Sequence, residues 1–323
     1  MLMRKYFLTA AVLLVSLAGF TQKKDSLPPT APAKAGAPAG FPGAIPKQGP
    51  KPYKEVITDK AITKKGLFIV HKVDDKFYFE IADSLLGREI LAVTRLAKVA
   101  GGGGKYGGEE LNQQSLLFEK GPSQNIFIRV VTLISSADTT NTISKAVRNS
   151  YLDPIAAAFD IKAYGKDSTS SIIDVTDFFK GDNQIVGLDA NDKRQFGLTM
   201  LAGDRSYIQS INTYPINTEI RTVKTYSASA SSGPPIPSPF PAPASLPAAR
   251  NAGAITLELN TSMILLPETP MHRRLFDSRV GYFADRFTVF SDDQQKVDNQ
   301  TFAVRWKLEP KPADMEKYKR GEL

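Results

Sequence analysis

The chain of 323 residues is long enough for one large or two modest domains, and its 42% hydrophobic content is typical of a globular protein. It contains no cysteine, which excludes a disulfide framework, a thiolate zinc site and a lipid-modified cysteine after a signal. The formal net charge of +8 is concentrated in residues 1–54, so the nearly neutral remainder argues against nucleic-acid binding by a folded basic face.

Residues 1–21 have the order of a secretory signal peptide: Arg4 and Lys5 come first, then an apolar run, then small residues. The apolar run is shorter than a typical membrane span, so we expect no transmembrane span after signal cleavage. The mature chain is expected in the periplasm, on the outer surface or outside the cell. Residues 22–53 are rich in Pro, Ala, Gly and Lys, a composition that buries little and predicts a disordered tether.

Residues 54–99 predict a small β domain. Two β-rich runs flank Asp74 and Asp75 within residues 66–82, which is a hairpin signal, and residues 88–99 supply a third run. Three strands make a sheet that needs a neighbour for stability.

A glycine-rich loop is expected over residues 100–114. Gly102, Gly104 and Gly107 satisfy the spacing G-x-G-x-x-G, which in dinucleotide-binding proteins joins a strand to a helix. Here the following residues do not open an amphipathic helix. We therefore interpret the glycines as a flexible loop and expect no cofactor-binding residue.

Residues 115–310 predict a larger antiparallel β-rich domain, because many runs alternate apolar and polar residues as a sheet with one buried face requires. A short helix is expected over 149–159, with Pro154 in its first turn. The Pro-rich residues 227–254 are interpreted as a solvated loop between neighbouring strands rather than a domain divider. The expected fold class is mainly β, an α+β protein with few short helices and a β-sandwich-like body. The strand candidates are 115–121, 125–135, 160–165, 171–175, 207–215, 218–226, 255–266, 279–291 and 301–309.

The sequence offers few residues for catalysis or metal binding. The two histidines, His71 and His272, are far apart, so neither a histidine-based zinc site nor a Ser-His-Asp triad can be assembled from the sequence. We expect His71 to be a half-buried or edge side chain of a strand and His272 to be exposed. Asp174 and Asp177 could form an acid pair, but we interpret residues 172–175 as the end of a strand and Thr176 or Asp177 as the cap of a one-turn helix. The stretch 203–208 predicts a turn with a local ion pair.

The sequence LPETPMHRRLFDSRVGYF, residues 266–283, concentrates charge between two predicted strands, and we name it the connecting segment. Arginine and carboxylate side chains in such a cluster form bidentate pairs or present guanidinium groups to an acidic partner. Two interpretations stay open: a clamp that holds the segment against its own sheet, and a docking surface for another domain. The candidate residues, structural or docking, are Pro270, Arg273, Arg274, Asp277, Arg279 and Tyr282.

The connecting segment and residues 305–323, RWKLEPKPADMEKYKRGEL, resemble the region before the catalytic domain in large secreted zinc-dependent metallopeptidases of the met-zincin type from Gram-negative bacteria. Residues 53–98 resemble that family's small first uncharacterised domain, and residues 149–179 and 203–211 resemble its second. In that family a helix with H-E-x-x-H holds zinc and its glutamate activates the bound water. The motif is absent here, so the resemblance assigns no catalytic, cofactor or metal residue, and zinc is expected only in a catalytic domain outside this chain.

We therefore expect an exported, non-catalytic, pro-domain-like region, inactive alone, whose partner is a downstream metallopeptidase domain of the intact protein. Residues 311–323 predict a short helix, starting at Pro312 and stopping at Gly321, and the truncated start of a next segment, so we expect a fragment. The alternative is a stand-alone secreted β-rich module for peptide or glycan, with an exposed aromatic patch formed from Tyr78, Tyr207 or Tyr214. An enzyme using Asp and Glu as acid and base would need two converging carboxylates.

Overall fold

The computed structural model describes residues 49–102, 105–132, 135–137, 141–228, 246–293, 295–305 and 308–322. The expected signal peptide and most of the tether lie outside the described residues. So do Gly104 of the glycine-rich loop and residues 229–245 of the Pro-rich loop. In the described part of the chain, no helix combines the length and the apolar character that crossing a membrane requires.

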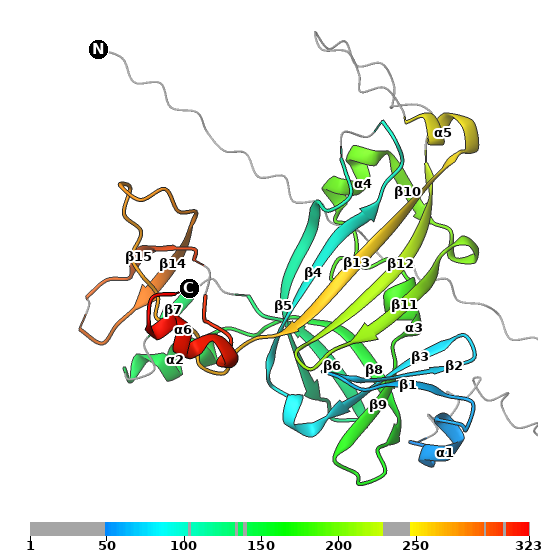
Figure 1. The fold of residues 1–323 in the computed structure, drawn as a ribbon, viewed down its shortest axis with the longest axis horizontal. Helices are drawn as coiled ribbons and strands as arrows, with labels where there is room; N and C mark the ends of the chain where they lie inside the picture. Colours follow the sequence, from blue (N-terminus) through cyan, green and yellow to red (C-terminus); the bar gives the residue numbers. More distant parts are fainter. Residues whose placement is uncertain are drawn as a thin grey trace, which may run out of the picture. The chain divides into compact units, whose positions relative to one another are not determined.

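The chain is mainly antiparallel β-sheet with a few short helices, as the sequence predicts. Its larger sheet has twelve described strands in the order β1-β2-β3-β9-β8-β6-β5-β4-β13-β12-β10, and β11 also pairs with β12 (Figure 1). All pairings in it are antiparallel. The strands are β1 (Ile62–Lys64), β2 (Ile69–Val73), β3 (Lys76–Ala82), β4 (Glu89–Lys98), β5 (Glu110–Lys120), β6 (Asn125–Val130), β8 (Ile155–Tyr164), β9 (Ser170–Asp174), β10 (Leu198–Leu201), β11 (Tyr207–Thr213), β12 (Asn217–Ala228) and β13 (Ala254–Leu265).

The strands of residues 54–99 form no separate sheet, because they join the larger sheet at two places. The hairpin β2–β3 turns at Asp74, whose φ of 51° is the left-handed conformation that Asp tolerates in turns. Strand β3 then pairs with β9, while β4 lies between β5 and β13. The neighbour that three isolated strands need is therefore supplied by strands from later in the chain.

The main core is built on phenylalanine side chains from four distant segments. Phe68 stacks on Phe79 of β3 at a ring-centroid distance of 4.8 Å and meets Phe118 of β5 edge-on at 5.5 Å. Phe179 approaches Phe79 at 5.6 Å, and all four rings are buried. Such aromatic pairs add about 0.5–1.5 kcal/mol each beyond the burial of their area.

Gly66 lies where two strands far apart in the strand order, β2 and β11, come together. Leu67 N donates to Tyr214 O at 2.7 Å, and Thr213 Oγ1 donates to Phe68 O at 3.1 Å, which joins the start of β2 to the end of β11. A Cβ on Gly66 would lie 2.6 Å from Tyr214 N and 2.7 Å from the Thr213 carbonyl carbon. Only glycine therefore allows this approach.

The expected helix over residues 149–159 is wrong. Helix α2 (Ile143–Ser150) ends before Pro154, and Ile155–Tyr164 forms β8. Residues Phe159, Ile161 and Ala163 alternate into the buried face of the sheet, and β8 pairs with β6 and β9. This pairing outweighs the helix propensity of the three alanines at 156–158.

The other helices are short. Helix α3 (Thr176–Lys180) confirms the one-turn helix. The expected cap, Thr176 or Asp177, is wrong, because the Thr176 N–H at the start of the helix donates to Asp174 Oδ1 at 3.1 Å. Helix α4 (Ala190–Phe196) is capped by Asp189, whose carboxylate accepts hydrogen bonds from two backbone N–H groups. The remaining ones are α1 (Tyr53–Val56), α5 (Pro247–Ala252) and α6 (Met315–Lys319) with its leading turn Pro312–Asp314. Gly321 follows α6 with a φ of 74°, so the predicted helix at 312–321 is confirmed.

A second sheet has three strands, β15-β14-β7. Strand β14 (Ala284–Phe290) pairs antiparallel with β15 (Asp298–Ala303) and parallel with β7 (Ser135–Ala137). The Pro-rich residues 227–254 connect β12 and β13, which pair with each other in the larger sheet, as expected of a connection between neighbouring strands. They are not solvated throughout, because Leu246 and Ala249, at α5, are buried. The connecting segment follows β13 and leads into β14.

We predict that Gly66→Ala lowers the free energy of unfolding by about 1–3 kcal/mol, because the added methyl group meets backbone atoms that cannot rotate away. The matched control is Gly203→Ala, where an added Cβ meets nothing within 4 Å and a change below about 0.5 kcal/mol is expected. Urea unfolding followed by circular dichroism measures both. Equal stabilities of the two variants would contradict the assigned closure.

Candidate functional site

The connecting segment extends the smaller sheet beyond β15. Phe276 N donates to Thr301 O at 2.8 Å, and Ala303 N donates to Arg274 O at 2.9 Å, so Leu275 and Phe302 form an antiparallel bridge. The backbone of residues 274–276 therefore lies beside β15 on the edge that β14 does not occupy.

Arg273 holds the segment to this sheet through aromatic rings. Its guanidinium carbon lies 4.8 Å from the ring centroid of Phe287 and 5.5 Å from that of Phe302. The two rings are 5.9 Å apart across β14 and β15. Cation–π contacts of this kind contribute about 0.5–1 kcal/mol at exposed sites.

Asp277 and Arg279 form a local ion pair. Arg279 Nε donates to Asp277 Oδ1 at 2.9 Å, and Nη2 donates to Oδ2 at 2.5 Å, a bidentate geometry that fixes the turn. The hydrogen bonds from Arg279 lower the pKa of the Asp277 carboxyl, and the same pair raises the pKa of Arg279. Because both side chains are open to solvent, the pair shapes the loop and adds little to stability.

A cavity of about 400 Å³ opens in this region. Of the residues singled out from the sequence, it brings together Arg274, Asp277 and Tyr282, whereas Pro270, Arg273 and Arg279 do not line it. Sequence reasoning missed the apolar residues of the cavity wall. The signal that could have found some of them is the presence of apolar residues among the charged ones of the connecting segment. The missed residues are Leu275, Phe276, Val280, Ala303 and Leu308, together with Arg305.

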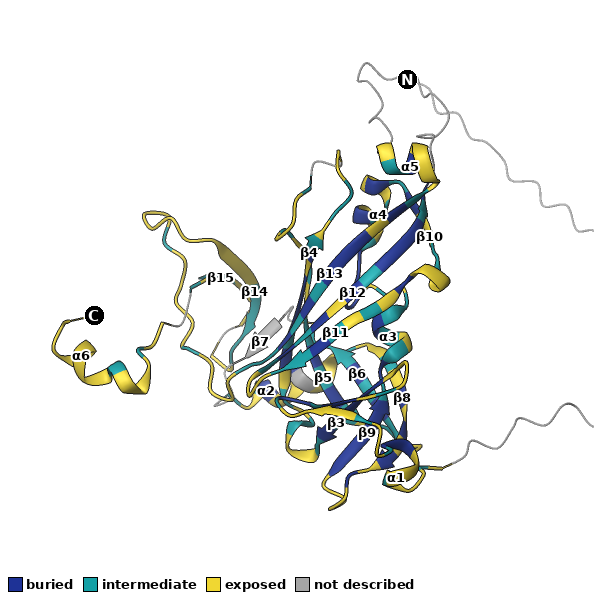
Figure 2. Ribbon diagram, turned by 45° about the vertical axis from the view of Figure 1, so that its right-hand side comes forward, coloured by how far each residue is buried: buried dark blue, intermediate teal, exposed yellow. Residues whose placement is uncertain are grey.

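The surface around this cavity is unusually apolar. Leu275 is 65% exposed, Phe283 89% and Leu308 88%. No residue of β14 or β15 is buried, whereas β4, β12 and β13 carry buried residues along their length (Figure 2). Neighbouring exposed apolar side chains of this kind are a common feature of interaction surfaces.

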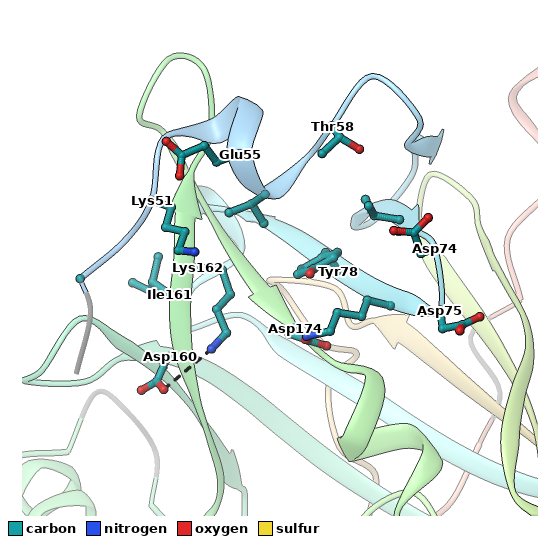
Figure 3. Close-up of a pocket in the computed structure, with 14 residues that line it drawn as sticks. Lys51, Glu55, Thr58, Asp74, Asp75, Tyr78, Asp160, Ile161, Lys162 and Asp174 are labelled. Atoms are coloured by element: carbon teal, nitrogen blue, oxygen red, sulfur yellow. Dashed lines mark hydrogen bonds and ion pairs between the residues drawn. The ribbon is translucent and has the colours of Figure 1, made fainter. Parts of the chain in front are cut away.

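Another hollow, of about 630 Å³, lies between α1, the β2–β3 turn and the strands β8 and β9 (Figure 3). Its charges are mixed. Lys76 Nζ lies 3.1 Å from Asp174 Oδ2, and Lys162 Nζ lies 3.9 Å from Asp160 Oδ2. The hydrogen bond to Asp174 raises the pKa of Lys76. These pairs engage Asp174 and Asp160, and Glu55, Asp74 and Asp75 also line the hollow, so it offers a polar surface rich in carboxylates.

His71 is buried, which corrects the expectation of a half-buried or edge side chain. It lies on β2, an inner strand, and the edge position belongs to β1. Its Nδ1 lies 2.8 Å from Thr63 Oγ1, its Nε2 lies 2.9 Å from Glu80 Oε2, and Ser170 Oγ donates to Glu80 Oε1 at 2.6 Å. The serine bonds the carboxylate rather than the imidazole, so this network ties β1, β2, β3 and β9 together and is no catalytic triad. His272 is exposed, as expected.

Lys224 is fully buried on β12. Its Nζ donates to Gly181 O at 2.6 Å, and burial lowers its pKa to about 8 despite the attraction of Asp182. Asp182 accepts from Tyr226 OH at 3.2 Å and from Lys193 Nζ at 2.8 Å. These bonds anchor the residues between α3 and α4 onto the sheet. Because the Lys224 side chain is buried and its ammonium is bonded to the backbone, we assign it a structural role.

The remaining sequence candidates do not converge. The glycine-rich residues lead into β5 rather than a helix. Asp204 and Arg205 form the predicted local pair at 3.8 Å before β11. Within the described ranges, no three His, Cys, Asp or Glu side chains are grouped so that they could hold a metal ion.

Comparisons with known proteins give two matches. Residues 108–311 match the family model described as Domain of unknown function (DUF5117). Residues 50–99 match the one described as Domain of unknown function (DUF5118). No curated protein and no solved structure matches the chain.

Glu80 predicts an acid-dependent loss of stability. The hydrogen bond from His71 lowers the Glu80 pKa below its ordinary value of 4.5, and the bond from Ser170 acts in the same direction. A lowered folded-state pKa stabilises the fold above the unfolded pKa, and this contribution is lost as the pH falls through the folded pKa. The stability advantage of the native chain over Glu80→Gln should therefore be constant above pH 5 and shrink below about pH 4. Unfolding titrations at each pH measure it, and an advantage that grows on acidification would refute the assignment.

Lys224 predicts a change in stability in the alkaline pH range. Its pKa of about 8 in the fold lies below the ordinary 10.5, so between these values the unfolded chain binds more protons. Stability from this group is therefore lowest below pH 8 and rises as the pH increases toward 10.5. Relative to Lys224→Met, the native chain should gain about 1–3 kcal/mol between pH 7.5 and 10. Subtracting the free energy of unfolding of the variant from that of the native chain removes the contribution of the tyrosines, which titrate in both proteins. Parallel curves of this free energy against pH would contradict a buried ammonium at Lys224.

Proposed function

We propose that this chain, which belongs to the family defined by the domain of unknown function DUF5117 over residues 108–311, is an exported, non-catalytic region supporting a zinc-dependent metallopeptidase domain. The proposal rests on the resemblance of the connecting segment and of residues 305–323 to the stretch before such a domain. The observation that carries it is the smaller sheet, on which no residue of β14 or β15 is buried.

The physical argument is one of incomplete burial. A sheet of three strands is stable in water only when it has a packed hydrophobic face or is covered by another element. Each large apolar side chain transferred from water to a packed interface contributes about 1.5–3 kcal/mol. The exposed Phe283 and Leu308 are thus a source of binding energy for a covering domain.

In this proposal the two sheets have separate roles. The larger sheet, with its phenylalanine core, is the rigid platform. The smaller sheet and the connecting segment face the peptidase domain, with Arg273 and the Asp277–Arg279 pair keeping the segment in one conformation. Zinc and its catalytic glutamate belong to the partner domain, and no residue of this chain is assigned to them.

Export forms part of the proposal. The signal-like residues 1–21 would direct secretion, and the Pro- and Lys-rich residues 22–53 would act as a spacer between the cleavage site and α1. A chain without cysteine forms no disulfide, so its fold does not depend on the redox state of the compartment.

The stand-alone binding module is less well supported. Tyr78 is buried, while Tyr207 and Tyr214 lie at opposite ends of β11, roughly 20 Å apart at about 3.3 Å per residue. These three residues therefore form no contiguous aromatic patch, and we do not favour recognition of peptide or glycan by them.

The proposal is tested on the gene and on the protein. We expect the DNA beyond codon 323 to encode H-E-x-x-H in one of the three reading frames. We also expect the purified chain to hydrolyse no casein with added zinc. Co-expression with the encoded domain should increase its soluble, zinc-dependent activity. The absence of such a reading frame, or chelator-sensitive hydrolysis by this chain alone, would overturn the proposal.

A further inference from the structure

We propose that the cavity beside residues 274–282 binds an extended, acidic and apolar segment of a partner domain. This inference rests on the proposed function, because it names the chemistry by which the smaller sheet takes up its partner. Three features of the described residues carry it: the shape of the cavity, its apolar wall and its unbalanced charge.

The cavity has the size of a specific binding site. Its volume of about 400 Å³ lies within the roughly 300–1,000 Å³ range of ligand pockets. The walls come from the connecting segment on one side and from Ala303, Arg305 and Leu308 on the other. Hydrogen bonds between Arg274 and Ala303 and between Val304 and Phe283, at 2.9 and 2.8 Å, hold these walls together.

The apolar lining selects apolar side chains in the occupant. Leu275, Val280, Tyr282 and Leu308 line the cavity and are each about half exposed or more. They remain wet because no described segment covers them. An entering side chain would remove apolar area from water on both partners, which drives association.

The charge of the lining selects carboxylates. Asp277 is the one acidic residue in the lining, and its bidentate pair with Arg279 satisfies both carboxylate oxygens. Two arginines, Arg274 and Arg305, are among the residues that line the cavity, whereas Arg279 is not. Arg305 Nη2 donates to His272 O at 2.8 Å, which positions its guanidinium group, and Arg274 has no carboxylate partner among the described residues. The cavity is therefore positive, and guanidinium groups match carboxylates bidentately.

The occupant is expected to be extended because the backbone of residues 274–276 could pair with an added strand. Residues 274–276 use Phe276 N and Arg274 O toward β15. In antiparallel pairing the intervening residue, Leu275, directs its own N–H and C=O to the other edge. An added strand there would place alternate side chains into the cavity, which is a common mode of peptide recognition.

The test uses fluorescence polarisation of the full chain with two fluorescein-labelled octapeptides. One alternates leucine with glutamate, and the other alternates leucine with lysine. We expect the glutamate peptide to bind at least about tenfold more tightly, and its affinity to fall with added salt. Equal affinities, or no binding of the glutamate peptide, would overturn the proposal.

Variants locate the binding. Arg274→Glu and Leu275→Asp should each weaken the glutamate peptide by about tenfold or more. The matched controls are Arg250→Glu on α5 and Met200→Asp on β10, which alter an exposed arginine and an exposed apolar residue outside the cavity and should leave the affinity unchanged. Unchanged circular dichroism melting confirms that all four variants fold. Equal losses in variants and controls would place the binding elsewhere.

The outcomes separate this inference from the proposed function. An H-E-x-x-H reading frame beyond codon 323 without peptide binding would reject the cavity and leave the metallopeptidase partner in place. Arg274-dependent peptide binding without such a frame would retain the cavity and reject the peptidase as its partner.

Discussion

The close approach of Gly66 to Thr213 and Tyr214 is the constraint on which the larger sheet depends. It joins β2 to β11, two strands that lie far apart in the strand order, and it places Phe68 against Phe79 and Phe118. Without this contact the phenylalanine core would lose one wall. The polar network of His71 and the anchored Lys224 then hold elements to a sheet whose path is already set by aromatic burial.

The smaller sheet lacks a comparable constraint. Its strands pair correctly, and Arg273 packs on Phe287 and Phe302, yet none of the residues on β14 and β15 is buried. The contrast within one chain is the basis of our proposal that the part with a complete core is a platform and that the part without one binds a partner. In that proposal the arginines that line its cavity add a preference for negative charge to an otherwise non-directional apolar attraction.

The candidate site was only partly predictable. Arg274, Asp277 and Tyr282 follow from the density of charged and aromatic residues in the connecting segment, and all three line the cavity. Ala303, Arg305 and Leu308 could not be assigned, because they reach the cavity only through the pairing of residues 274–276 with β15. Of the two sequence interpretations, a contact with the sheet is made by Arg273 on Phe287 and Phe302, whereas Asp277 and Arg279 pair only with each other. Docking to another domain stays a prediction.

By itself, the sequence determined the β-rich class, the hairpin at Asp74, the strand-to-strand nature of the Pro-rich loop and the short helix at 312–321, since these depend on local alternation, turn residues and caps. Only the tertiary structure decided that residues 155–164 form a strand, that residues 54–99 share a sheet with later strands, and that His71 is buried. The physical reason is that burial and strand pairing join residues distant in the chain, so an alanine-rich run or a lone histidine takes its state from partners that its neighbours in sequence do not reveal.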